Sequence, residues 1–496
     1  MGSKRIVVVG GGIAGISCIE GLLAEHDVNC PQLGTICLIA ESRLVKKPRS
    51  YELRGRNLEN FDVTSDDIET IFSSSNIPKG ISIEFLIGSV LSVDPETKTL
   101  LVKGRNSVER SPYDLICLCC GSQPKTLNLP SLKSYPELEQ RLFVVRDTTS
   151  VKSLDVKLKE CKHLAIIGNG GIGLELVSKI GSCDKTWIIK DESIGLTFFD
   201  SGASKFLLDH RSRPVPTGTQ SNSARSSDVY SLVGASEEQS SLNQGPSLGP
   251  NWLESFRLEG QSNGESLDII YEDEVDDITY DRESDTSPVV ITTKKGHRVC
   301  CDLVGIAIGT TPKPPELLNS TLELNPQDGG IEIDDQMRTS VGSIYAAGDV
   351  VSCNKWPSSK LWFQKRLWTQ ARQMGFYAGR CMLCHLNNSS PSLYFNFDVF
   401  SHCTTFLGHK LILLGKFNGQ DLSDEEAKCC EVLARVIKGK EYVKLLLKDN
   451  RIIGAVLIGE TGLEETIENL IYDQIDVSDQ KSRLLDGSVD IEDYYD

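Results

Sequence analysis

Two glycine-rich turns, each placed between an apolar strand and a helix, constrain the fold of this chain most strongly. The first follows the apolar residues 6–9 and reads Gly10-Gly11-Gly12-Ile13-Ala14-Gly15. In a GxGxxG turn, the first glycine permits the tight turn, the second lets a pyrophosphate approach the backbone, and the third lets helix and strand pack closely. The unpaired N–H groups at the start of the helix favour phosphate. This pattern predicts a dinucleotide site.

The second turn repeats the pattern later in the chain. Residues 164–167 form an apolar run that leads into Gly168-Asn169-Gly170-Gly171-Ile172-Gly173, and a helical stretch follows. Two such turns predict two nucleotide-binding units in one chain. The alternative is a duplicated unit that packs and binds no ligand.

Charged residues at the ends of the next strands bear on which nucleotides bind. Residues 35–40 end in Glu41, whose carboxylate is suited to the two hydroxyls of an adenosine ribose. The strand 187–189 is followed by Lys190 and Asp191. A carboxylate there favours NADH and a cation accommodates the 2′-phosphate of NADPH, so the preference between NADH and NADPH stays open.

Three further segments complete the pattern. Residues 115–124 are an apolar strand that ends in a turn containing Gly121 and Ser122, and residues 303–312 repeat this arrangement around Gly309. Residues 339–349 read TSVGSIYAAGD, in which Gly348 allows a close approach and Asp349 is suited to accept a ribityl hydroxyl of a flavin.

The order of these five motifs over residues 5 to about 380 resembles the flavoproteins with two dinucleotide-binding domains, the pyridine nucleotide-disulfide oxidoreductase superfamily. Residues 442–470 resemble the C-terminal domain of NADH:rubredoxin oxidoreductases and nitrite reductase large subunits. Lys190-Asp191, residues 248–252 (LGPNW), 366–375 (RLWTQARQMG) and 491–494 (IEDY) resemble an animal branch of the superfamily.

The resemblance implies an α/β fold with two Rossmann-like domains, one for FAD and one for NAD(P), the second inserted in the first, plus a C-terminal α+β domain. The expected FAD-binding domain comprises residues 1–125 and 313–394, and the NAD(P)-binding domain residues 126–312. The C-terminal domain is expected at 395–485 and an acidic tail at 486–496. Residues 211–250, rich in Ser, Gly, Pro, Asn and Gln, predict a disordered surface insertion.

The resemblance also implies the site residues. The expected FAD residues are Gly10, Gly12, Ile13, Ala14, Gly15, Glu41, Val90, Gly121, Ser122, Gly348 and Asp349. The expected NAD(P) residues are Gly168, Asn169, Gly170, Gly171, Gly173, Glu175, Lys190, Asp191 and Gly309. Lys46 and Lys47 are candidates to lie beside the flavin, where a cation stabilises its anionic reduced form, and Glu175 is a candidate to face the nicotinamide. A solvated basic loop is the alternative for the two lysines.

The internal dithiol of disulfide reductases has no counterpart at its expected positions. No cysteine lies between Glu41 and Asp114, and residues 126–310 contain no C-x-x-C. Cys381 and Cys384 form a C-x-x-C near the end of a helix expected over 364–380, where packing is favoured over a redox or metal pair. The vicinal pairs at 119–120, 300–301 and 429–430 are expected to be structural, since adjacent strand residues point opposite ways. His402 and His409 have no thiol to serve, and no metal site is expected.

Composition narrows the partners and the compartment. A net charge of −17 argues against direct binding to nucleic acid or an anionic membrane, and no apolar run reaches the ~18 residues that span a bilayer. Because an apolar strand begins at residue 6, we expect no targeting peptide ahead of it. Scattered cysteines fit reduced thiols. We expect a soluble protein of the cytoplasm and nucleus; the resemblance adds the muscle sarcomere.

Two hypotheses follow for function. In the first, the chain is an oxidoreductase that passes electrons from NADH or NADPH through FAD to an unknown external acceptor. The resemblance implies a role in the response to oxidative stress and protection of a tRNA ligase complex, with that complex as a candidate binding partner. In the second, the chain is a slow redox sensor that acts through partner binding while a reduced FAD–NAD(P) complex persists.

Overall fold

The computed structural model describes residues 3–24, 32–72, 77–104, 106–211, 248, 252, 256–262, 264–315, 322–353, 356, 361–392 and 397–486. The predicted insertion at 211–250 lies outside these residues except for Arg211 and Leu248. The predicted acidic tail lies outside them except for Asp486. None of the helices in the described ranges combines the length and apolar character needed to cross a bilayer.

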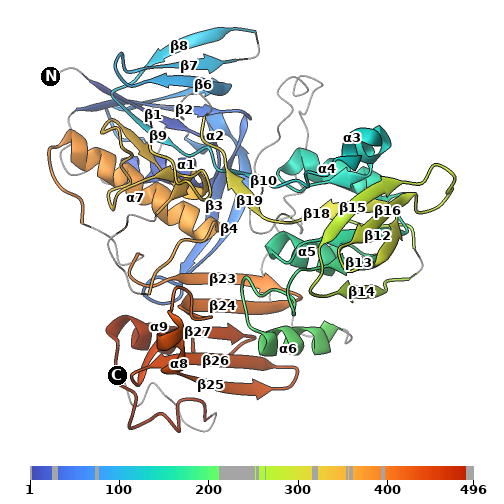
Figure 1. Cartoon of the computed structure of the whole chain (residues 1–496). Coiled ribbons are helices and arrows are strands. Elements are labelled where there is room, and N and C mark those ends of the chain that lie inside the picture. The colour runs from blue at the N-terminus through green and yellow to red at the C-terminus, as the bar shows by residue number, and fades with distance from the viewer. Residues whose placement is uncertain are drawn as a thin grey trace.

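The first nucleotide-binding unit is a parallel five-stranded sheet with the order β21-β9-β1-β2-β5. Its strands are β1 (Lys4–Val9), β2 (Leu33–Ala40), β5 (Ser82–Ile87), β9 (Leu115–Leu118) and β21 (Ile344–Ala346). Residues 6–9 of β1 and all of β9 are apolar and buried, as parallel strands covered on both faces must be. Helices α1 (Ile13–Ala24) and α7 (Trp368–Leu386) pack side by side in this unit (Figure 1).

The second nucleotide-binding unit repeats this design. Its parallel sheet has the order β11-β18-β12-β13-β14 and carries helices α4 (Thr148–Leu158) and α5 (Gly171–Lys179). Its strands are β11 (Leu142–Phe143), β12 (His163–Ile167), β13 (Asp184–Ile188), β14 (Leu267–Ile270) and β18 (Leu303–Ile306). Two chain crossings join the units, through the antiparallel pair β10 (Ser122–Pro124) and β19 (Thr310–Pro312). The expected α/β fold, with one nucleotide unit inserted in the other, is confirmed.

Smaller elements complete the two units. Antiparallel layers are formed by β6 (Ser89–Asp94), β7 (Thr99–Lys103) and β8 (Val108–Pro112), and by β15 (Val275–Tyr280), β16 (Val289–Thr293) and β17 (Arg298–Cys301). The remaining elements are α2 (Ile68–Ile71), α3 (Ser131–Ser134), α6 (Ser201–Arg211), η1 (Pro136–Gln140), η5 (Gly348–Val350), β20 (Ile331–Glu332) and β22 (Val351–Ser352).

The C-terminal domain is an antiparallel sheet with the order β23-β24-β27-β26-β25. Its elements are β23 (Ser401–Phe406), β24 (His409–Gly415), α8 (Asp424–Lys428), β25 (Cys430–Ile437), β26 (Glu441–Lys448), β27 (Arg451–Ile458) and α9 (Glu464–Asp473). A polar turn at 448–451 joins β26 to β27, and Lys448 pairs with Arg451 across it. Asp449 and Asn450 adopt the positive φ values of 50° and 56° that tight hairpin turns require.

The helix expected over residues 364–380 is displaced toward the C-terminus. The side-chain amide of Gln364 bonds the backbone of Val351 and Cys353, which keeps this stretch in a loop. Leu367 is extended (φ −131°, ψ 152°), so α7 begins only at Trp368. The helix continues beyond residue 380 because Cys381, Met382, Leu383 and Leu386 remain buried on its inner face.

A long antiparallel ribbon follows Glu41. Strands β3 (Leu44–Leu53) and β4 (Glu59–Asp67) pair antiparallel and run from the first sheet to the C-terminal sheet (Figure 1). At its tip, the buried carboxylate of Glu468 on α9 accepts the backbone N–H groups of Arg56 and Asn57 at 2.8 and 3.0 Å. The hydroxyl of Ser401 donates to the carbonyl of Asn57 at 2.9 Å. The ribbon therefore connects the first nucleotide unit to the C-terminal domain.

The second nucleotide unit also contacts the C-terminal domain. Asp200, just before α6, pairs with Lys444 at 2.7 Å and accepts the hydroxyl of Tyr442 at 2.9 Å. Lys444 and Tyr442 lie on β26, and Figure 1 shows α6 beside this strand. The C-terminal domain is thus tied to both nucleotide units.

We expect Glu468→Ala to lower the free energy of unfolding by about 2–4 kcal/mol, because the buried N–H of Asn57 and the part-buried N–H of Arg56 lose their acceptor. The matched control is Glu465→Ala on the exposed face of the same helix, with an expected change within about 0.5 kcal/mol. Urea denaturation of both variants measures the difference. Equal effects would show that Glu468 does not hold the ribbon tip.

Candidate functional site

The first glycine turn has the geometry that close backbone approach requires. Gly10 has φ +119°, and a Cβ there would lie 2.2 Å from the carbonyl oxygen of Cys119. A Cβ on Gly15 would lie 1.9 Å from the carbonyl oxygen of Gly10. Gly12 starts α1 by accepting the N–H of Ile16, while Ile13 and Ala14 are buried beneath the turn. The turn fits the predicted FAD pyrophosphate.

Two predicted FAD residues far apart in sequence meet in the structure. The hydroxyl of Ser122 donates to Asp349 Oδ2 at 2.8 Å. Burial raises the pKa of Asp349, and the bond from Ser122 opposes that rise. The structure therefore brings together a hydroxyl and a buried carboxyl that are suited to a ribityl chain. Gly121 has φ +71° and borders open space, and Gly348 has φ +80°.

Glu41 lies at the end of β2, as predicted for a ribose acid. It accepts the hydroxyl of Ser89 at 2.8 Å, and the Lys313 ammonium lies 3.9 Å away. Val90, the next residue on β6, is half-buried. Ser89 and Lys313 were not among the predicted residues, and neither belongs to a motif that would have identified it.

The structure separates the two candidate lysines. Both lie on β3, where adjacent side chains face opposite sides. Lys46 is fully buried, its Nζ donates to Ser65 Oγ at 2.5 Å, and its backbone N–H donates to the Gly11 carbonyl at 2.9 Å. Burial lowers the pKa of Lys46 to about 8. Lys47 is half-buried, and its charge partly opposes the effect of burial, which raises the pKa of Glu20 on α1. Of the two, Lys46 is the one that lies against the glycine turn.

The second glycine turn repeats the first. Gly168 has φ +113°, and a Cβ there would lie 2.2 Å from the Ala307 carbonyl oxygen. A Cβ on Gly173 would lie 2.6 Å from the Gly168 carbonyl oxygen, which also accepts the Trp187 indole N–H at 2.7 Å. Gly170 is the N-cap of α5 and no side chain caps it, so the first N–H groups of the helix are free of side-chain competition. The turn fits a pyrophosphate.

The strand-end pair Lys190-Asp191 differs in how each side chain is held. The amide of Asn169 donates to Asp191 Oδ2 at 2.8 Å and to the Ser193 carbonyl at 2.9 Å, while it accepts the Gly195 N–H at 2.6 Å. Lys190 is exposed. Asp191 is therefore oriented by the glycine turn itself, and Lys190 is not.

Glu175 and Gly309 complete the predicted second site. Gly309 has φ +99° and borders open space. Glu175 lies on α5, and its Oε2 accepts the indole N–H of Trp252 at 3.0 Å. Burial raises the pKa of Glu175 to about 7. Trp252 lies in the LGPNW segment at residues 248–252. The sequence carries no local signal of its contact with Glu175, because 77 positions separate the two residues.

The cysteines and histidines of interest lie in packed surroundings. Cys381 is buried on α7, and burial raises its thiol pKa. The buried His402 contacts Thr369 Oγ1 at 3.1 Å through Nδ1, and burial followed by the charge of Lys365 lowers its pKa to about 3. His409 packs against the ring of Phe206. Within the described ranges, no three His, Cys, Asp or Glu side chains gather as a metal site.

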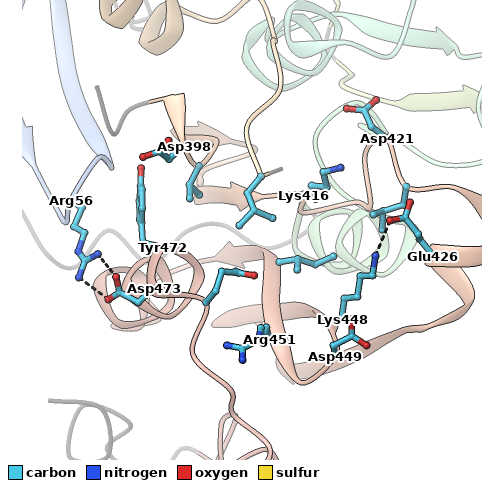
Figure 2. A pocket seen from close by; sticks show the side chains of 15 residues that line it. Arg56, Asp398, Lys416, Asp421, Glu426, Lys448, Asp449, Arg451, Tyr472 and Asp473 are labelled. Atoms are coloured by element: carbon cyan, nitrogen blue, oxygen red, sulfur yellow. Dashed lines mark hydrogen bonds and ion pairs between the residues drawn. The ribbon is translucent and has the colours of Figure 1, made fainter. Parts of the chain in front are cut away.

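A cavity of about 1150 Å³ lies on the C-terminal domain, between the ribbon tip and the ends of β26 and β27 (Figure 2). Charged side chains of both signs line it, and two ion pairs lie in its walls: Lys448–Glu426 at 2.8 Å and Arg56–Asp473 at 2.6 Å. No predicted cofactor residue lines it. We assign no cofactor to this cavity.

Comparison with known families finds two matches. The pattern of the family described as pyridine nucleotide-disulphide oxidoreductase matches residues 4–240 and 257–375. The pattern of the rubredoxin NAD⁺ reductase C-terminal domain matches residues 406–475. The first match covers both glycine turns, and the second lies within the C-terminal sheet and α9.

Curated relatives align over nearly the whole chain. Pyridine nucleotide-disulfide oxidoreductase domain-containing protein 1 of Homo sapiens is 36% identical, with 99% of this chain and 98% of the relative covered. The protein of the same name from Dictyostelium discoideum is 31% identical, with 99% and 100% covered.

Solved structures share the fold. The water-forming NADH oxidase from Lactobacillus brevis, bound to NADH, has a TM-score of 0.64 at 18% identity, with 97% of this chain and 93% of that chain covered. The covalent putidaredoxin reductase–putidaredoxin complex gives a TM-score of 0.65 at 16% identity, with 100% and 99% covered.

We expect Gly173→Ala to weaken nicotinamide nucleotide binding on the order of a hundredfold, or about 2.7 kcal/mol, because its Cβ would collide with the Gly168 carbonyl. FAD content should stay normal. The control is Gly342→Ala, outside the predicted site, whose Cβ would meet no other atom within 4 Å. Equilibrium titration with NAD⁺ measures both. Similar affinities for the two variants would argue against the predicted site.

We expect Asp191→Ala to weaken NADH by about tenfold, through loss of charge-assisted hydrogen bonds, without weakening NADPH. Lys190→Ala should weaken NADPH and leave NADH unchanged. Separate titrations of both variants with both nucleotides test this. An equal loss for the two nucleotides in Asp191→Ala would contradict a ribose contact.

Proposed function

This chain belongs to the pyridine nucleotide-disulphide oxidoreductase family, and on that premise we propose that it passes electrons from NADH or NADPH, through FAD, to an acceptor outside the chain. Flavin bound at the first turn would accept hydride from the nicotinamide and hold two electrons. The two turns and the residues around them support FAD and NAD(P)H as the cofactors.

The observation that carries the external acceptor is the ribbon β3–β4. It directly follows the predicted ribose acid Glu41, where disulfide reductases carry their dithiol helix, and it contains no cysteine. Its buried Lys46 donates a backbone hydrogen bond to the glycine turn. A cation is available at this position, and a thiol is not.

The position of each site residue indicates the role that we propose for it. The Ser122–Asp349 pair and Glu41 would hold the ribityl chain and the adenosine ribose. Lys46 would stabilise negative charge on the reduced ring system, because a buried cation acts in a low-dielectric environment. On the second turn, Asn169 would keep Asp191 directed at the other ribose. In this arrangement the chain would orient both cofactors for hydride transfer.

A role in the response to oxidative stress, with protection of a tRNA ligase complex, is our proposal for the process that this chemistry serves. The cytoplasm and nucleus are the proposed compartments. A direct test adds the FAD-loaded protein and NADH to a purified tRNA ligase in air. Ligase activity should decay more slowly with the FAD-loaded protein and NADH than with the FAD-loaded protein without NADH. Equal decay in the two mixtures would contradict the proposal.

We expect anaerobic mixing with NADH or NADPH to bleach the flavin absorbance of the purified protein. The double variant Cys381→Ser/Cys384→Ser should bleach at the wild-type rate, because electrons do not pass through that pair. A slower rate or a thiol count that rises on reduction would contradict an external acceptor.

Admission of air after reduction separates the two modes of action. Reoxidation within milliseconds indicates an oxidase, whereas reoxidation over many minutes indicates the redox-sensor alternative. A colourless protein that takes up no FAD would contradict the proposal in both forms.

A further inference from the structure

Trp252 contacts a predicted site residue of the second nucleotide unit. Its indole N–H donates to Glu175 Oε2 at 3.0 Å, and its side chain is only 1% exposed. Tryptophan offers a donor and no acceptor, so this contact favours the ionised form of Glu175 over the protonated form. The contact therefore stabilises the charged form of the Glu175 carboxyl group.

Leu248, four positions earlier, contacts the other nucleotide unit. Its carbonyl accepts the indole N–H of Trp368 at 3.3 Å, and its side chain is buried. Trp368 is the first residue of α7, and it packs against Ile13 after the first glycine turn and Val63 of the ribbon. Leu248 and Trp252 therefore contact the two helices, α7 and α5, that belong to the two cofactor units.

We propose that Trp252 is a positioning residue that acts through Glu175, fixing its carboxylate toward the nicotinamide ring. This inference rests on the proposed function. A glutamate side chain has several rotatable bonds, and a single directed hydrogen bond from a buried indole selects among its rotamers. A carboxylate so fixed can bond a nicotinamide carboxamide, which sets the orientation of the ring for hydride transfer.

The charges around Glu175 agree with this role. Burial raises the pKa of Glu175 to about 7, and the Trp252 hydrogen bond and the charge of Lys179 on the same helix lower it. Helix α5 also contacts β12 and β23. On β23, His402 is neutral, and nearby Lys365 has a pKa lowered by burial to about 8. Loss of the indole N–H therefore raises the pKa of Glu175 further and lowers the ionised fraction of this carboxyl group at neutral pH.

The test compares Trp252→Phe with the wild type, both as the full-length, FAD-loaded protein. Phenylalanine keeps an aromatic ring and removes the N–H. We expect NAD⁺ to bind with unchanged affinity at high pH, the pH midpoint of the NAD⁺-induced flavin difference spectrum to rise, and flavin reduction at neutral pH to slow by about tenfold. Glu175→Gln should abolish the midpoint, because an amide does not titrate.

The matched control is Trp356→Phe, which removes another indole N–H, donated to the Asp334 carbonyl at 3.0 Å. It should leave the midpoint and the rate unchanged. The inference is overturned if Trp252→Phe keeps the wild-type midpoint and rate, or if it only lowers the melting temperature. If NADH and NADPH fail to reduce the wild-type flavin, the proposed function fails, whereas the NAD⁺ difference spectrum still tests Trp252.

Discussion

The arrangement of this molecule depends on two glycine turns in which backbone meets backbone without an intervening Cβ. At Gly10 and Gly168 the chain leaves a buried parallel strand with positive φ and passes within contact of a neighbouring carbonyl. Gly15 and Gly173 then let each helix settle on the turn that precedes it. Because each helix starts at the carboxyl edge of its sheet, two anion-binding sites form on one chain. The carboxylates at Glu41 and Asp191 can serve as ribose acceptors only because the turns place them at the same edges.

What distinguishes this chain from a disulfide reductase is concentrated in the ribbon β3–β4. The chain segment that would present a dithiol instead presents a buried lysine. Burial lowers the pKa of Lys46 to about 8, so its ammonium is sensitive to whatever negative charge develops beside it. The ribbon offers no thiol pair that could accept electrons from a bound cofactor. This agrees with an acceptor outside the chain.

The glycine turns, the parallel sheets and the candidate roles of Ser122 and Asp349 could be anticipated because each rests on a local pattern of strand, turn and helix. The contact between Ser122 and Asp349 could not, because 227 positions separate the two residues. The ribbon could not: residues 44–53 read LVKKPRSYEL, in which charge and Pro48 conceal a strand that pairs through its backbone. The start of α7 was misplaced because the amide of Gln364 bonds a distant loop, a tertiary contact without a local signal. The Glu175–Trp252 bond was missed for the same reason, since its partners lie 77 positions apart.

The ribbon tip has a consequence for how such proteins vary. The C-terminal domain has its own sheet and its own core, and by those criteria it looks like an interchangeable module. Its Glu468 carboxylate and Ser401 hydroxyl, however, are matched to backbone groups of residues 56–57 in a different domain. A C-terminal domain moved to another chain would lack the backbone groups that its Glu468 and Ser401 bind. The ribbon left without this domain would end in unpaired N–H groups. Recombination between relatives should therefore exchange the hairpin and the terminal domain together.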